Sequence, residues 1–231
     1  MDSTHVSGNG SLNDIALTRM RTAIIRCELP PGSRLKVDSL SKAYGLSSSP
    51  IREALNRLAQ EGIVQATENR GFWVAPMSVA DFQDITRMRS LLEPEALRDA
   101  IEHGDEEWEI AVLTAFHRLS LAEKKLGTGP VALDDGWAER HRAFHMALFS
   151  ATPSALLLGM VESLFDRAER YRRFSALHRT EERHKGSEHE ALMKAALDRD
   201  ADKATKLLRS HIGGTLASVA AALQRQQATI Q

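Results

Sequence analysis

The chain has 231 residues, of which 42% are hydrophobic and 26% are charged, and its formal net charge is −1. This composition is sufficient to build a hydrophobic core. No apolar run is long enough to span a membrane, and the single cysteine, Cys27, excludes a disulfide framework and a thiolate metal cluster. A reduced, cytoplasmic setting is therefore expected. Residues 1–11 are polar and are expected to form a disordered tip.

Residues 12–77 have the pattern of a small helical domain that ends in a hairpin. Ser49 and Pro50 suit the start of a helix, and Gly62 suits its end. The last part of the segment has two β-rich runs around an Asn-Arg-Gly turn. The predicted elements are helices over 13–27, 37–44 and from Pro50 to Gly62, and a hairpin over 63–75. This order predicts a winged helix-turn-helix domain.

Residues 78–231 have almost no strand pattern. Ser78 and Asp81 resemble a capping box that starts a new helix after Pro76. Helical periodicity then continues almost to the end of the chain. The predicted helices are 79–103, 106–125, 134–150, 154–177, 181–199 and 201–225. The fold class is therefore mainly α, with a winged helix-turn-helix domain followed by an all-α bundle of about six helices.

The helix predicted to begin at Pro50 has the features of a recognition helix. Arg52 lies in its first turn, where the positive end of the helix dipole disfavours a cation. In a recognition helix, however, an arginine at this end can form two hydrogen bonds to a guanine in the major groove. Asn56 lies one turn further on the same face, whereas Glu53 and Arg57 are expected to pair with each other. A solvated basic face remains the alternative, and it is favoured for Arg34, Lys36 and Lys42 taken singly, whereas DNA contact is favoured for Arg52. The further candidate DNA contacts are Ser47, Ser48, Ser49, Arg70, Gly71, Lys36 and Arg34.

The motif HRAFH places His141 and His145 four residues apart. On a helix both imidazoles stand on one face, where they can hold one metal ion. Two surface histidines give the same pattern, and spacing alone leaves both interpretations open.

The first third of the chain resembles the DNA-binding head of the GntR family of bacterial transcription regulators. The resemblance is carried by ELPPGSRL, GLSSSPIREALNRLAQEGIV and NRGFWVA, and it covers about residues 13–77. It implies binding to a double-stranded DNA operator. One position departs from the family pattern, because Ser48 stands where the family has an arginine. The operator sequence of other members therefore cannot be transferred to this chain.

The rest of the chain resembles the ligand-sensing FCD domain of the FadR branch of that family. The resemblance is carried by DITRMRSLLEPEAL, HRAFHMAL, EHEALMKAALDRD and LLRSHI. The motifs RHRAFH and LFDRAERYR are most similar to the CsiR-type repressors. This resemblance implies a divalent metal held by His145, His189 and His211, with His141 at the position of the family's aspartate. Imidazole donors favour zinc, and nickel or iron are alternatives.

The same resemblance implies that Arg89 binds the carboxylate of an effector, with Tyr171 and Arg172 in the same pocket. An ion pair between Arg89 and Glu93 is the alternative. The implied function is a homodimeric repressor that leaves a near-palindromic operator when glutarate, 2-hydroxyglutarate or another organic or sugar acid binds. A metal-dependent enzyme is the second hypothesis, although the sequence has no H-E-x-x-H motif. A constitutive architectural DNA-binding protein does not explain so large a helical domain.

Overall fold

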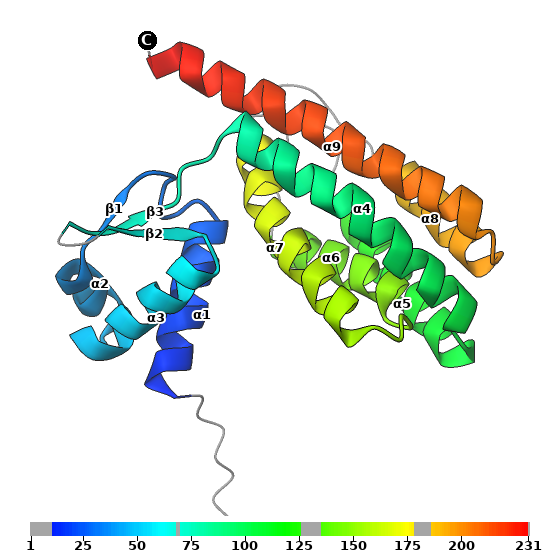
Figure 1. Ribbon diagram of the computed structural model, residues 1–231, viewed down its shortest axis with the longest axis horizontal. Helices are drawn as coiled ribbons and strands as arrows, with labels where there is room; N and C mark the ends of the chain where they lie inside the picture. The colour runs from blue at the N-terminus through cyan, green and yellow to red at the C-terminus, as the bar shows by residue number, and fades with distance from the viewer. Residues whose placement is uncertain (1–10, 68–69, 126–134, 178–185, 231) are drawn as a thin grey trace, which may run out of the picture. The chain divides into compact units, whose positions relative to one another are not determined.

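The computed structural model describes residues 11–67, 70–125, 135–177 and 186–230. The chain divides into two compact units, Met1–Met77 and Ser78–Gln231. Residues 1–10 of the predicted tip, the Gly-Thr-Gly-Pro segment at 127–130 and the first residues of the helix predicted to begin at 181 lie outside the described residues. Ser11, the last residue of the predicted tip, is instead the N-cap of the first helix. The predicted fold class is confirmed in both units (Figure 1).

The first unit is a winged helix-turn-helix. A core of apolar side chains that includes Met20, Ile24, Ile51, Leu55 and Leu58 joins its helices. Gly45 ends the second helix in the left-handed conformation, as its position in the sequence predicted. The elements are α1 (Leu12–Ile25), β1 (Arg34–Leu35), α2 (Val37–Tyr44), α3 (Ser48–Gln60), β2 (Val64–Thr67) and β3 (Gly71–Val74).

The wing is a three-stranded antiparallel sheet rather than the predicted two-stranded hairpin. Its order is β1-β3-β2, and Phe72 of β3 is the register partner of both Leu35 and Ala66. The two-residue strand β1 is too short to show a periodic pattern in the sequence. The sheet therefore ties the segment before α2 to the wing.

Two helix ends in this unit differ from the prediction. α3 begins at Ser48 with Ser47 as its N-cap, so Ser49 is not the cap and Pro50 is the third helical residue. Proline is tolerated there because the first N–H groups of a helix have no intrahelical acceptor. α1 ends at Ile25, and Cys27 adopts a left-handed φ of 59° outside the helix.

The second unit is a bundle of six helices in the described residues, as predicted. Ser78 caps the first helix by accepting a hydrogen bond from the Asp81 amide at 3.0 Å, and this helix continues without interruption through Pro94. The elements are α4 (Val79–His103), α5 (Glu106–Lys125), α6 (Asp135–Phe149), α7 (Ala155–Leu177), α8 (Gly186–Leu197) and α9 (Ala201–Ile230).

Helix α4 is central to the bundle, because it packs against α7 and α9 as well as α6 (Figure 1). α4 and α7 run antiparallel, since Phe82 stacks on Tyr171 at one end and Thr152, just before α7, bonds to Asp99 near the other. Buried aromatic side chains of α6, among them Phe144 and Phe149, fill the interior. Among the described residues, no helix is long and apolar enough to cross a membrane.

Candidate functional site

Four buried histidines converge inside the helical unit. His141 and His145 come from α6, His189 from α8 and His211 from α9. One potential ligand atom from each residue lies within 4.8 Å of the others. The surface interpretation of the HRAFH motif is therefore wrong, and the structure brings together all four histidines of the predicted metal site.

The donors in this cluster fit a metal ion. His141 Nδ1 and His189 Nε2 are buried and have no hydrogen-bond partner among the described residues. An unsatisfied buried polar atom costs about 1–3 kcal/mol, and coordination to a cation satisfies it. Burial, followed by the neighbouring His145 and Arg172, lowers the pKa of His141 well below its usual value. Its imidazole is therefore neutral near pH 7, which is the form that binds metal.

Two carboxylates contact this cluster from outside. His189 Nδ1 lies 3.0 Å from Glu123 Oε1 on α5, and His211 Nδ1 lies 2.8 Å from Glu188 Oε2 on α8. Sequence reasoning missed both glutamates, because neither stands at a helical spacing from the histidine it contacts.

Phe165 of α7 joins the histidines to two buried arginines. Its ring centroid lies 5.5 Å from that of His141 and 5.2 Å from that of His145. The guanidinium carbon of Arg172 lies 4.1 Å from the Phe165 ring centroid, and that of Arg89 lies 5.2 Å from it. Both predicted effector-binding arginines therefore lie next to the predicted metal ligands.

Each of these arginines already has an acidic partner. Arg89 forms an ion pair with Glu93 that includes a hydrogen bond of 3.1 Å to Oε2, which is the arrangement that the alternative for Arg89 predicted. Arg172 donates to Glu169 at 2.9 Å and to the Phe165 carbonyl at 3.1 Å. Burial lowers the pKa of Arg172, and the charge of Glu169 opposes this effect.

Tyr171 is directed elsewhere. Its hydroxyl donates to Asp81 and accepts from the Ser78 amide at 3.4 Å, and its ring stacks on Phe82 with centroids 4.6 Å apart. Adjacent residues on a helix point about 100° apart, so Tyr171 and Arg172 do not face one pocket. Tyr171 contacts the start of α4 instead.

The candidate DNA contacts lie on the surface of the first unit. Arg52 and Asn56 are exposed on α3, one turn apart. The predicted pair between Glu53 and Arg57 is wrong, because both side chains contact α1: Asn13 donates to Glu53 at 2.6 Å, and Arg57 lies 3.3 Å from Asp14. The remaining exposed candidates at the start of α3, on the wing and before α2 are Ser47, Ser48, Ser49, Arg70, Gly71, Lys36 and Arg34.

Arg34 and Arg70 are connected across the wing. Arg34 donates to the Arg70 carbonyl at 3.3 Å, and its guanidinium lies 5.7 Å from the Trp73 ring centroid. Gly71 has a φ of 103°, a conformation that suits glycine at this turn. Arg34 therefore supports the wing, whereas Arg70 keeps an exposed side chain.

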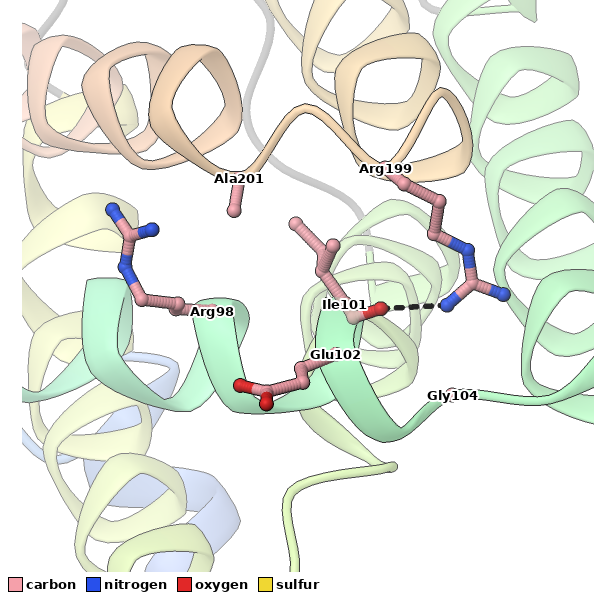
Figure 2. A pocket seen from close by; sticks show the side chains of 6 residues that line it. All are labelled: Arg98, Ile101, Glu102, Gly104, Arg199 and Ala201. Atoms are coloured by element: carbon pink, nitrogen blue, oxygen red, sulfur yellow. Dashed lines mark hydrogen bonds between the residues drawn. The ribbon is translucent and has the colours of Figure 1, made fainter.

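A surface hollow of about 510 Å³ lies where α4 ends and α9 begins (Figure 2). Arg199 on its edge donates to the Ile101 carbonyl at 2.6 Å and pairs with Glu109. Its lining includes none of the predicted site residues. The lining residues are Arg98, Ile101, Glu102, Gly104, Arg199 and Ala201.

A winged helix-turn-helix joined to a helical unit with a buried polar centre is the plan of a ligand-sensing transcription regulator. The sequence matches the family described as "Bacterial regulatory proteins, gntR family" over residues 15–74 and the FCD domain over residues 84–214. The chain belongs to the GntR family and carries an FCD domain. It is a DNA-binding transcription regulator.

Relatives extend over nearly the whole chain. The HTH-type transcriptional regulator BphR of Paraburkholderia xenovorans is 41% identical over 209 residues, which cover 90% of this chain and 85% of BphR. The HTH-type transcriptional repressor GlaR of Escherichia coli is 37% identical over 200 residues, which cover 84% of this chain and 89% of GlaR. The solved structure of E. coli McbR/YncC matches with a TM-score of 0.74, 94% and 100% coverage of the two chains and 21% identity, a likeness of fold.

Proposed function

We propose that this regulator is a metabolite-responsive repressor whose helical unit holds a divalent metal and senses a small carboxylate. The observation that carries the proposal is the buried group of four histidines beside Arg89 and Arg172. Binding of the acid to the helical unit causes the first unit to release the operator. The coupling free energy equals the difference in the free energy of acid binding between the DNA-free and the DNA-bound regulator.

Zinc is the favoured metal, with nickel and iron as alternatives. All four candidate ligands are imidazoles, which suit these ions, whereas magnesium and calcium prefer oxygen donors. His145, His189, His211 and His141 would hold the ion. The ion would supply a positive charge at which an anionic effector can bind.

A five-carbon dicarboxylate fits the two kinds of positive group in this region. One carboxylate can bind at the metal, and the other can form a two-pronged pair with a guanidinium. Arg89 and Arg172 both lie against Phe165, beside the histidines. The effector must share or replace Glu93 or Glu169 as the partner of these arginines. Glutarate or 2-hydroxyglutarate is favoured, and the similarity to CsiR-type repressors supports this choice.

The regulator is proposed to act as a homodimer through the helical unit. Exposed apolar side chains lie on the antiparallel pair α4 and α7: Met88 (41% exposed), Leu91 (58%), Leu156 (72%) and Met160 (47%). Burial of such side chains against a second copy is favourable. A two-fold dimer would present two α3 helices to a near-palindromic operator.

The direct test measures operator release by fluorescence anisotropy. The zinc-loaded full chain is bound to labelled DNA from upstream of its own gene, and glutarate, 2-hydroxyglutarate, lactate and a sugar acid are titrated separately. We expect a five-carbon dicarboxylate to lower DNA affinity, and we expect the uncharged diamide of glutaric acid to have no effect. DNA binding that no acid changes would refute the sensing role and leave the DNA-binding role intact.

A further inference from the structure

We propose that Glu123 and Glu188 are positioning residues of the metal centre, which orient His189 and His211 and supply the negative charge that four imidazoles lack. This inference rests on the proposed metal site. It assigns a role to two carboxylates, each of which contacts a single candidate ligand in the part of the chain that the structure describes. It also gives helix α5 a part in the metal centre, although α5 carries none of the four histidines.

The contact between Glu123 and His189 fixes which ring nitrogen is available for metal. Glu123 Oε1 lies 3.0 Å from His189 Nδ1, and the His189 side chain is fully buried. A carboxylate at this distance accepts the Nδ1 proton and therefore leaves Nε2 deprotonated. His189 Nε2 is the buried atom without a hydrogen-bond partner in the described part of the chain, so the free lone pair lies where a ligand is needed.

The contact between Glu188 and His211 repeats this arrangement. Glu188 Oε2 lies 2.8 Å from His211 Nδ1, and the His211 side chain is 6% exposed. Glu188 and His189 are consecutive residues on α8, so one turn of this helix gives both a ligand and the carboxylate that orients the ligand on α9. The start of α8 is thereby tied to α5 on one side and to α9 on the other.

Charge balance gives these glutamates a second role. A divalent cation held by four neutral imidazoles leaves two positive charges in the protein interior, and an unpaired buried charge is costly. Two carboxylates hydrogen-bonded to the ligands offset that charge and make the imidazoles stronger donors. Because the carboxylates stay outside the coordination sphere, the donors to the metal remain nitrogen.

The experiment measures zinc affinity of the full chain by competition with a chromophoric chelator. Glu123→Gln and Glu188→Gln keep the side-chain shape and remove the charge, and each is expected to weaken zinc binding about 10- to 100-fold. Glu190→Gln is the matched control, because Glu190 lies on the same helix but pairs with Lys194 at 2.7 Å. The control should bind zinc like the wild type.

Cobalt(II) absorption separates positioning from a general loss of structure. The wild type and the Gln variants should give the intense visible bands of a four-coordinate site, whereas Glu123→Ala should change the band pattern because His189 loses its orienting partner. Circular dichroism of each apo variant shows whether the bundle has folded. Glu188 is 46% exposed, so its Gln variant provides a folded test case even if the change at Glu123 prevents folding.

The outcomes for the metal site and for the two glutamates are distinguishable. Tight zinc binding by the wild type and equal affinity in both Gln variants would overturn the role of the glutamates and leave the proposed metal site standing. A wild-type protein that binds neither zinc nor cobalt would overturn both. Weaker binding in the two Gln variants, with normal binding in Glu190→Gln, supports the inference.

Discussion

Arg89 and Glu93 form an ion pair in the interior of the helical unit, one turn apart on α4. Their side chains are 3% and 0% exposed. A buried ion pair contributes little net stability, but the loss of one partner leaves an uncompensated charge. A ligand that competes for Arg89 would therefore disturb this pair, and under the proposed function this would connect effector binding to the central helix of the bundle.

Removal of one member of this pair should destabilise the protein strongly. We expect Arg89→Leu to lower the free energy of unfolding by about 3–5 kcal/mol, because Glu93 is left buried without its partner. The double variant Arg89→Leu/Glu93→Leu should recover most of this loss. Urea denaturation measures both, and Arg87→Leu on the exposed side of α4 is the control. A double variant no more stable than Arg89→Leu would contradict the charge argument.

Replacement of a metal ligand should empty the centre. The wild type is expected to contain about one zinc ion per chain, and His145→Ala to contain almost none, because three remaining imidazoles bind far more weakly. Elemental analysis of tag-free protein measures the ratio. His117→Ala, at an exposed position on α5, is the control and should keep its metal. Equal metal content in wild type and His145→Ala would remove His145 from the ligand set.

Arg52 should contribute to DNA recognition without contributing to stability. Arg52→Ala is expected to weaken operator binding by about 1–3 kcal/mol and to reduce the preference for operator over unrelated DNA. Arg57→Ala removes the same charge from α3, but Arg57 faces Asp14 on α1, so its effect on operator preference should be small. Anisotropy titrations at fixed salt compare the two variants. If both variants lost operator affinity and operator preference to the same extent, the effect of Arg52 would be a nonspecific effect of its charge.

The hydroxyl of Tyr171 should stabilise the folded protein at neutral pH, and this contribution should be lost as the pH rises above about 10. Burial, followed by the hydrogen bond to Asp81, raises the pKa of Tyr171 above its usual value. The unfolded chain then releases this proton near pH 10, while the folded chain retains it, so rising pH favours unfolding. Tyr171→Phe should cost about 1 kcal/mol at neutral pH. It should also lose stability less steeply above pH 10.

Thermal unfolding between pH 8 and pH 11 tests this expectation for Tyr171. Tyr44 provides the matched control, because its hydroxyl lies in the other unit and its pKa is raised less. If the stability of Tyr171→Phe fell as steeply with rising pH as that of the wild type, the phenol of Tyr171 would not be the cause of the loss of stability at alkaline pH.

The sequence predicted the helices well because their ends carry capping signals. Ser78 and Gly45 were both located correctly in this way. The start of α3 was misplaced because three consecutive serines before Pro50 offer three equivalent caps, and the structure uses Ser47. Local signals also could not reveal β1, which exists only because it pairs with β3.

The candidate metal site shows the same division between local and tertiary information. His141 and His145 were recognisable from their spacing, whereas His189 and His211 were identified through resemblance to a family. Glu123 escaped detection because its contact with His189 joins helices that are distant in the sequence. Such contacts arise from packing, and no periodic pattern encodes them.

The distribution of the four histidines over three helices also has a consequence for the order of folding. Helices form from local contacts, whereas the cluster requires α6, α8 and α9 to come together, with the closure of long loops. On the ribosome the winged helix-turn-helix emerges first, and His211 is available only when α9 has been synthesised. A nascent chain can therefore complete its winged helix-turn-helix before it can assemble the four-histidine cluster.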